Sequence, residues 1–465
     1  MTQHTNPMGF ESINKLIMRF SIPAITGMMI NALYNIVDRI YIGNHPELGA
    51  NGLAGITLGF PMMLIMLAMA VLFGVGGATL FSMSLGQKNP EQAKRTLSTS
   101  FILLTAISIV YMIVGQVFLP QLLVIFGASE TILPYSMEYM RVILFGTTFQ
   151  VLSMGLNHFV RADGSPKIAM YTMFLGAGTN ILLDPLFIFV FGWGMFGAAF
   201  ATVIAQALSA TWVVLYFIGK KSHIHLDLKT LVFDSALAKK LSGLGMPGFS
   251  LQLAGSLLVS ILNRSLTVYG GDLAVSAMGI VNSVQTFMIM PIIGLNQGLQ
   301  PIISFNFGAK QYARVKEAIK LGITYASLIT LSGYLLTLFF PSFLVSIFNR
   351  EPELMALSEF ALSTWFSVLF VIGFQIIASN FFQAIGRSKM ALFLTLTRQV
   401  LILIPAILIL PLFFGLDGVF YAGPTADFLA FLITGFFFLK TYNSLDHLKA
   451  TETLASVSEE SLEII

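Results

Sequence analysis

One acidic residue stands inside a long apolar run, in the segment Asn180-Ile-Leu-Leu-Asp184-Pro185. The i, i+4 spacing puts Asn180 and Asp184 on one face of a helix. Pro185 has no amide to bond back to residue 181, so a carbonyl beside the carboxylate is freed. Such an oxygen-rich spot can bind a proton or a hard cation such as Na⁺. The alternative is a carboxylate that pairs with a neighbouring helix for packing alone. We favour function, because acids inside membrane helices are ordinarily functional.

A second group of polar residues ends the first apolar run. Asn31, Tyr34, Asn35 and Asp38 recur at the i, i+3, i+4, i+7 period of one helical face. A polar stripe in an apolar helix is expected to face inward. Asp38 has two interpretations from the residues alone, as a site residue or as an interfacial acid paired with the adjacent Arg39.

The remaining polar candidates are neutral. Thr202 and Gln206 form an i, i+4 pair, although a Thr in a membrane helix more often bonds its own backbone, which favours structure over function. The second half of the chain offers amides, of which some are expected to contact substrate and others to join helices. The candidates are Gln252, Asn282, Gln285, Asn296, Gln297, Gln300, Gln375 and Asn380. Arg398 and Asp427 are expected to pair across their helices for structure.

Several kinds of chemistry have no residues to support them. Cysteine is absent, which removes thiolate nucleophiles and Cys-ligated metals. His158, His223 and His225 are too few and too unsuitably spaced for a metal site. The sequence shows neither a phosphate-binding loop nor a nucleophile with its base. We therefore expect no enzyme activity and no cofactor beyond a coupling ion.

The composition indicates what surrounds these residues. The chain has 465 residues, of which 56% are apolar and 10% charged, with a mean hydropathy of +0.83. A soluble globular protein carries about 25% charged residues. Most of the surface must therefore face lipid. The net charge of +3 does not come from a basic patch, so no nucleic-acid partner is expected.

Twelve apolar runs are long enough to cross a membrane, since spanning about 30 Å of hydrocarbon takes roughly 20 helical residues. Six runs fall in each half. The predicted spans are 16–36, 52–84, 97–119, 134–160, 168–190, 196–218, 241–266, 274–306, 319–341, 355–385, 391–413 and 418–440.

The positive charges predict the orientation of these spans. If the amino terminus is cytoplasmic, 20 of the 25 Lys and Arg fall in cytoplasmic segments and only Arg39, Arg264 and Arg350 in outer loops, while Arg141 and Arg398 remain within helices. The pattern predicts that both termini are cytoplasmic.

The two halves of the chain are similar in sequence at a constant offset. The segment 84–94 after the second run matches 306–316 at an offset of 222, which aligns Lys88 with Lys310. The same offset carries residues 162–167 onto 384–389. A six-helix unit was therefore duplicated, and because six is even the copies are parallel repeats. The expected domains are a first lobe (1–218), a basic cytoplasmic linker (219–240), a second lobe (241–440) and a cytoplasmic tail (441–465).

The repeat, the end of the first helix at Asp38-Arg-Ile-Tyr-Ile-Gly43 and the segments 159–167 and 180–185 together resemble the multidrug and toxic compound extrusion (MATE) family over about residues 12–445. The chain is most similar to the DinF branch and its MepA-like members. The resemblance implies a MATE/MOP-type all-α membrane fold, with twelve helices in two pseudo-symmetric six-helix lobes. It also implies a cation site of the first lobe built from Asp38, Asn180 and Asp184, with Tyr34, Asn157 and Thr202 as neighbours.

The resemblance further implies the function. The chain is expected to export organic cations and drugs by antiport with H⁺ or Na⁺, as a monomeric multi-pass protein of the bacterial inner membrane that alternates access between two lobes. Asp38, Asn180, Asp184 and Thr202 would couple the ion. Substrate would meet Asn31, Tyr34, Asn35, Asn157, Gln206, Asn282 and Gln285. Neither the choice between H⁺ and Na⁺ nor the natural substrate follows from the sequence.

Two other functions stay open. The same superfamily fold supports flippases for lipid-linked sugars or other amphiphiles, which tend to line their cleft with several basic residues. Only Arg398 and Arg141 are candidates for that role here. The third interpretation, from a different class, is a membrane receptor or scaffold without transport activity.

Overall fold

The computed structural model describes residues 6–43, 48–219 and 221–462, and in this part of the chain the regular structure is helical throughout, with no strand. Within these ranges the side chains of residues 35, 36, 38–40, 43, 49, 50 and 447–462 are not described.

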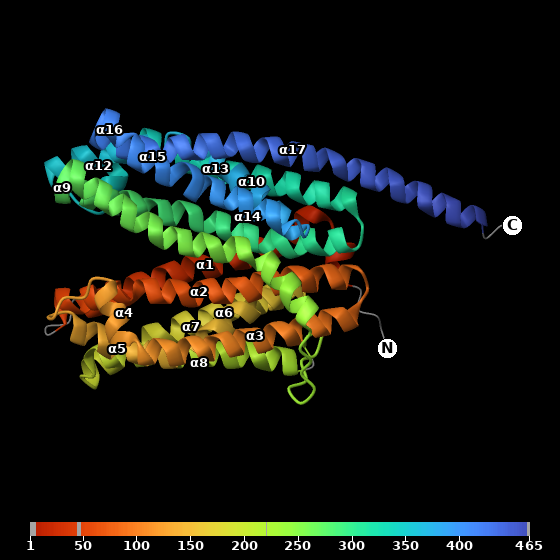
Figure 1. Ribbon diagram of the computed structural model, residues 1–465, viewed down its shortest axis with the longest axis horizontal. Helices are drawn as coiled ribbons and strands as arrows, with labels where there is room; N and C mark the ends of the chain where they lie inside the picture. The colour runs from red at the N-terminus through yellow and green to blue at the C-terminus, as the bar shows by residue number, and fades with distance from the viewer. Residues whose placement is uncertain (1–5, 44–47, 220, 463–465) are drawn as a thin grey trace. The chain divides into compact units, whose positions relative to one another are not determined.

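The first repeat consists of long helices joined by short turns. A short 3₁₀ turn, Pro7–Gly9, precedes it. Its helices are α1 (Ile13–Gly43), α2 (Gly49–Gly86), α3 (Pro90–Val117), α4 (Leu119–Ile125), α5 (Leu133–Phe145), α6 (Thr147–Ala162), α7 (Pro166–Pro185), the π-helix η2 (Leu186–Val190) and α8 (Gly194–Ile218). Figure 1 shows α3, α5, α6, α7 and α8 running lengthwise beside one another.

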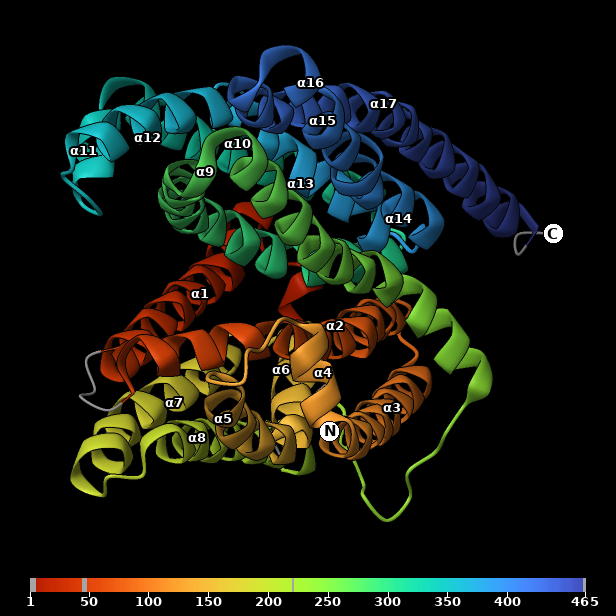
Figure 2. The same ribbon diagram turned by 60° about the vertical axis from the view of Figure 1, so that its left-hand side comes forward.

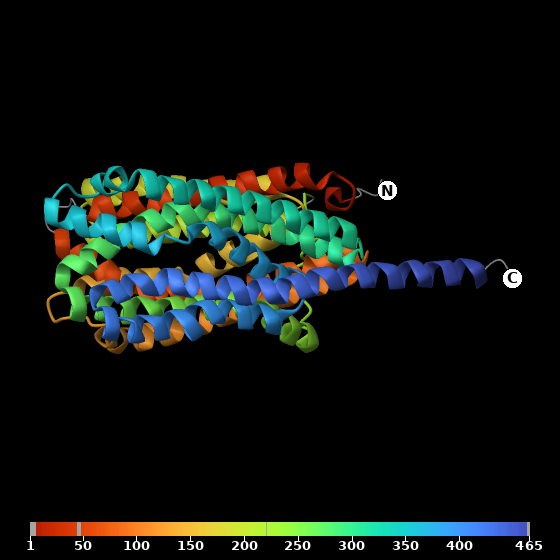
Figure 3. The same ribbon diagram turned by 90° about the horizontal axis from the view of Figure 1, so that it is seen from above.

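The second repeat follows the same order. Its elements are α9 (Ser235–Gly308), α10 (Tyr312–Phe339), α11 (Pro341–Ser346), α12 (Pro352–Trp365), α13 (Leu369–Ala384), α14 (Ser388–Leu396), the π-helix η3 (Thr397–Leu403), α15 (Ile404–Ile409), α16 (Pro411–Phe414) and α17 (Leu416–Leu462). In Figure 2 the short α11 and α12 lie together, and in Figure 3 α17 continues well past its neighbouring helices.

These helices account for the twelve predicted membrane spans. In the described residues, nine helices are long and apolar enough to cross a membrane, and α12 with α13, bent by 48°, makes a tenth. The 74-residue α9 divides at Gly271, where φ is 63°, and so supplies two spans. The two shorter helices α5 and α6, on either side of Gly146, together make the remaining one. The predicted all-α membrane fold is confirmed.

The backbone repeats its unusual conformations as the sequence offset predicts. Lys88 (φ 55°) and Lys310 (φ 60°) are the two non-glycine residues with positive φ in the described chain, and they are 222 residues apart. Gly164 (φ 92°) and Gly386 (φ 82°) have the same separation. A left-handed conformation is costly for a side chain such as lysine. Its retention in both copies supports the duplication of the six-helix unit.

Two glycines at this offset also bring the ends of α2 and α9 into backbone contact. A Cβ atom on Gly86 would lie 2.0 Å from the carbonyl oxygen of Phe305, and one on Gly308 would lie 2.2 Å from that of Met83. The contact is reciprocal, because Phe305 occupies in the second copy the place that Met83 has in the first, and Gly308 the place of Gly86. Only glycine permits this approach of two helix backbones.

The chain divides into two compact units. One comprises Met1–Ser21, Ser82–Asn89 and Leu257–Ile465, and the other Ile22–Phe81 and Pro90–Ser256. The divisions fall within α1, α2 and α9 and in the turn between α2 and α3, and the segment 221–234 belongs to the second of these units. The domain boundaries predicted from the sequence stay predictions.

Each unit has a packed interior and an apolar exterior. Trp365, Phe366 and Phe420 are among the buried residues of the Leu257–Ile465 unit. Large apolar side chains are also exposed, such as Leu182 and Phe413, each 74% accessible. A surface of this kind suits lipid rather than water.

Candidate functional site

Asp184 lies near the end of α7, fully buried within its unit. The π-helix η2 begins directly after Pro185, which cannot donate a backbone hydrogen bond. Single π turns within helices are rare and often occur at functional sites, because they displace backbone groups from the regular ladder. The predicted local irregularity beside the carboxylate is therefore present.

A short hydrogen-bonded chain connects α7 to α8 at this point. Asn180 Nδ2 donates to Asp184 Oδ1 at 3.1 Å and to Thr202 Oγ1 at 3.2 Å. Thr202 Oγ1 in turn donates to the carbonyl oxygen of Ala198 at 3.1 Å. The structure thus brings together three of the predicted site residues. Thr202 bonds its own helix backbone, as the structural interpretation expected, and also contacts the site.

The cluster presents more acceptor oxygens than donors. Asn180 is 2% exposed, and its Oδ1 atom has no hydrogen-bond partner among the described residues. A buried polar oxygen normally has a donor, since leaving it unsatisfied costs about 1 to 3 kcal/mol. Carboxylate, amide and hydroxyl oxygens at one buried position are suited to binding a proton or a small hard cation.

The helix that carries Asp38 runs along α7. A Cβ on Gly27 of α1 would lie 2.4 Å from Sδ of Met173, and the ring of Tyr41 meets that of Phe189 edge-on with centroids 6.2 Å apart. Phe189 belongs to η2, so the end of α1 lies beside the π turn that follows Asp184. Asn31 and Tyr34 are partly buried on α1.

The acid predicted on this helix cannot be placed. The side chains of Asn35 and Asp38 fall outside the described residues, although both belong to α1. Their parts in the ion or substrate site stay predictions.

Two more predicted residues lie in the same unit. Asn157 Nδ2 in α6 donates to the carbonyl oxygen of Ala169 in α7 at 2.9 Å, so this amide connects two helices. Gln206 of α8 lies against the break between α5 and α6, where a Cβ on Gly146 would come 3.0 Å from its Oε1 atom. Both side chains keep a buried oxygen without a partner among the described residues.

The second unit contains the remaining candidates. Asn282 is exposed and Gln285 partly exposed on the later half of α9. Their contact with substrate stays a prediction. Arg398 Nε donates to Asp427 Oδ1 at 2.5 Å, which confirms the predicted pair. Arg398 lies in η3, the π-helix of the second repeat.

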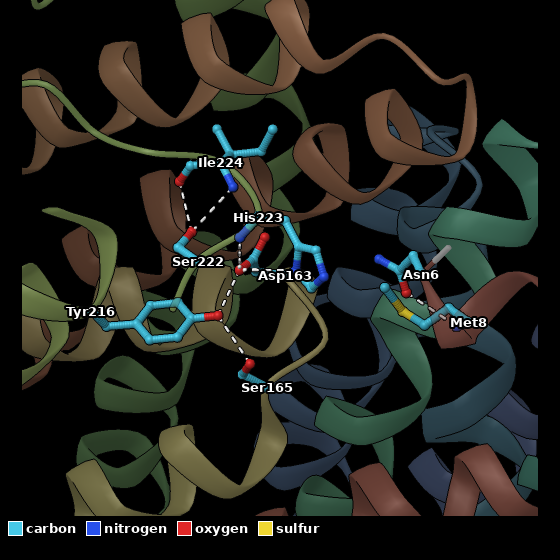
Figure 4. Close-up of polar contacts among 8 residues, drawn as sticks. All are labelled: Asn6, Met8, Asp163, Ser165, Tyr216, Ser222, His223 and Ile224. Carbon is cyan, nitrogen blue, oxygen red and sulfur yellow. Dashed lines mark hydrogen bonds and ion pairs between the residues drawn. The ribbon is translucent and has the colours of Figure 1, made fainter. Parts of the chain in front are cut away.

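Sequence reasoning missed a polar junction at the end of α6. The carboxylate of Asp163 is fully buried, and its Oδ2 accepts hydrogen bonds from Tyr216 Oη at 2.5 Å and from the backbone amide of His223 at 3.0 Å (Figure 4). Nδ1 of His223 lies 3.5 Å from the same oxygen. The sequence contains one signal that could have revealed Asp163, which is a difference between the two copies. The offset of 222 places Ile385 in the second copy where the first copy has Asp163.

This junction fixes the start of the segment that joins the two repeats. The hydrogen bond to Asp163 and its negative charge raise the pKa of His223, although burial acts in the opposite direction. At its other end the segment is held by α3, where Ser98 Oγ accepts from the amide of Val232 at 2.8 Å. Asp234 then begins α9 by accepting from the amides of Ala236 and Leu237.

We predict that protonated His223 protects residues 221–234 from opening. A raised pKa in the folded state means that this contribution is complete below the ordinary histidine pKa of about 6.5 and is lost as pH rises through the folded value. His223→Gln should therefore increase hydrogen–deuterium exchange in the segment more at pH 6 than at pH 9, each compared with the unaltered chain at the same pH. His225→Gln, in the same segment, is the control. An equal increase at both values of pH would contradict the role of the charge.

Comparison with known proteins places the chain in a family. The MatE family model matches residues 23–186 and again residues 248–409, which together make up well over half of the sequence and include one stretch of each repeat. The chain belongs to the MatE family.

Relatives and solved structures cover almost the whole chain. The multidrug export protein MepA of Staphylococcus haemolyticus is 28% identical over 95% of this chain and 96% of its own length. A structure of the MATE multidrug transporter DinF-BH in complex with rhodamine 6G is 36% identical, covers 94% of this chain and 97% of its own, and superposes with a TM-score of 0.87. A MOP superfamily transporter from Pyrococcus furiosus is 25% identical over 96% of this chain and 99% of its own, with a TM-score of 0.89.

These likenesses establish the general class. The chain is a multi-pass membrane transporter with the twelve-helix, two-lobe MATE fold, and it is not an enzyme. The resemblance to the MepA-like members of the DinF branch, expected from the motifs, is confirmed.

Proposed function

We propose that this transporter exports organic cations and drugs by antiport with H⁺ or Na⁺, alternating access between its two lobes. The relative from Staphylococcus haemolyticus is a multidrug export protein, and DinF-BH binds rhodamine 6G. We extend both properties to this chain because the likeness covers nearly its whole length. We further propose that it acts as a monomer in a bacterial cytoplasmic membrane with both termini inside.

The observation that carries the proposal is the buried cluster of Asp184, Asn180 and Thr202. A negative carboxylate in a membrane helix attracts a cation of any kind. When a proton or Na⁺ occupies it, the charge is neutralised and the attraction for a cationic substrate is lost. Asp38, on the adjacent α1, is proposed to share this exchange. Competition for one charge would couple ion entry to drug release.

The same oxygens suit both H⁺ and Na⁺, so the coupling ion must be found by experiment. Purified protein in liposomes should move ethidium or rhodamine 6G when a pH gradient or a Na⁺ gradient is imposed alone. We expect at least one of the two gradients to drive transport above the leak of protein-free liposomes. Dye movement that required ATP, or that ignored both gradients, would contradict the proposal.

The same liposomes separate the alternatives. A flippase would redistribute a fluorescent lipid between leaflets, and a receptor or scaffold would move neither dye nor lipid. A flippase needs basic residues to hold phosphate, and one of its two candidates, Arg398, is already paired with Asp427. The one remaining candidate, Arg141, is fewer than the several basic residues that a flippase cleft tends to have, which favours cation export.

A further inference from the structure

A large cavity lies between α5 and α8, apart from the Asp184 cluster. Its volume is about 870 Å³, within the range of ligand sites in proteins. Phe145, Phe196 and Phe200 supply much of its apolar lining. Phe145 is 63% exposed and Phe196 40%, so the cavity is open to a ligand from outside the unit.

Three charged residues border this apolar space, and they follow one face of α5 and the turn before it. Glu130, Glu138 and Arg141 all line the cavity. Glu138 Oε1 accepts a hydrogen bond from the amide of Phe196 at 3.1 Å, which fixes the acid at the first turn of α8. Arg141 forms no ion pair with any residue that the structure describes, although it was one of two basic residues that the sequence places within a membrane span.

The order of these groups along α5 is informative. Glu138 lies one turn nearer the start of the helix than Arg141, and Val142 and Phe145 lie deeper. From the membrane–water boundary inward, the cavity therefore presents first a carboxylate, then a guanidinium and then apolar side chains. The order holds whichever side of the membrane the start of α5 faces.

We propose that the cavity binds one phospholipid with an ethanolamine headgroup. The phosphate would meet the Arg141 guanidinium, the ammonium would meet the Glu138 carboxylate, and an acyl chain would lie over Phe145 and Phe200. Side chains three residues apart on a helix have Cβ atoms about 5 to 6 Å apart. That spacing matches the two-carbon link between phosphate and ammonium in this headgroup. Under the predicted orientation, the lipid comes from the outer leaflet.

The charges favour this lipid over other occupants. An anionic phospholipid such as phosphatidylglycerol would offer the same phosphate to Arg141, but beyond it would place neutral hydroxyl groups, and no ammonium, beside the two glutamates. A choline headgroup cannot donate a hydrogen bond to Glu138. A lipophilic cation would suit the glutamates and the rings, but it would lie against the positive guanidinium of Arg141.

The test is native mass spectrometry of the purified full-length protein with phosphatidylethanolamine, phosphatidylcholine or phosphatidylglycerol added in turn. The unaltered chain should retain one phosphatidylethanolamine in preference to the other two. Arg141→Gln should weaken retention by up to about fivefold, the upper end of what one exposed ion pair contributes. Glu138→Gln should still bind lipid but lose the preference for ethanolamine. Arg350→Gln, which changes an arginine predicted in an outer loop, should behave as the unaltered chain.

A second readout locates the lipid. The centroid of the Trp193 ring lies 6.0 Å from the centroid of the Phe196 ring. In a chain with Trp212→Phe and Trp365→Phe, phosphatidylethanolamine with brominated acyl chains should quench Trp193 more than the matching phosphatidylglycerol. Equal quenching by both lipids, or equal retention of all three, would overturn the proposal. So would rhodamine 6G binding that Glu138→Gln abolishes and Arg141→Gln leaves intact, because the cavity would then be a cation site.

Discussion

Asp184→Asn is expected to give a folded protein that no longer couples dye efflux to an ion gradient. The asparagine has the same shape and can still accept a hydrogen bond from Asn180. It cannot carry a negative charge or exchange a proton. Couplings between two ligands are typically 1 to 3 kcal/mol, so gradient-driven efflux should fall roughly 5- to 150-fold. Initial rates of rhodamine 6G transport in liposomes measure this.

The control for this change is an acid at the start of another long apolar helix. Asp417 is exposed in the first turn of α17 and belongs to the other compact unit of the chain. Asp417→Asn should transport at the normal rate. Thermal unfolding of both variants in detergent establishes that neither has lost its fold. Normal coupled efflux by Asp184→Asn would show that the cluster has no part in transport.

Gly308→Ala is expected to destabilise the protein strongly for such a small change. The new Cβ would lie 2.2 Å from the carbonyl oxygen of Met83, and both groups belong to helix backbones that cannot turn aside. The ends of α2 and α9 must then separate, which gives up packing on both helices. Overpacking of this kind costs roughly 1 to 3 kcal/mol. The melting temperature in detergent should fall by a few degrees, and Gly308→Val should lower it further.

A matched substitution lies on the same helix. Gly279 of α9 has open space where its Cβ would be. Because alanine is the better helix former by about 1 kcal/mol, Gly279→Ala should leave the melting temperature unchanged or raise it. If both variants melt at the same temperature, the close approach of the two backbones is not needed for stability.

The helices themselves could be predicted from the sequence. A membrane span must satisfy its own backbone hydrogen bonds, which makes it a helix, and its side chains face lipid, which makes it an apolar run. The run 52–84 corresponds to Gly49–Gly86, and 196–218 to Gly194–Ile218. The repeat also predicted backbone detail, since the two left-handed lysines lie at the offset found in the sequence. Helical spacing predicted that Asn180 and Asp184 share one face, and the family resemblance added Thr202 to them.

The features that could not be predicted depend on contacts between elements that are distant in sequence. Asp163 lies in the segment 162–167, which indicated only the repeat and the family resemblance, and nothing near it in the chain indicates Tyr216 or His223 as partners. The cavity beside Arg141 likewise needs α8, more than fifty residues further on, to close one of its sides. Periodicity reports which face of a helix is apolar. It does not report which other helix will lie there.

The crossed contacts of Gly86 with Phe305 and of Gly308 with Met83 have a consequence for how the transporter arose. When residue i of one copy meets residue j of the other and j meets i in return, the arrangement is that of an isologous interface with twofold symmetry. Two separate chains of the ancestral six-helix protein could form it with a single glycine in each. A homodimer of the six-helix protein would thus have had, before gene fusion, the same pair of contacts that the single polypeptide now encloses.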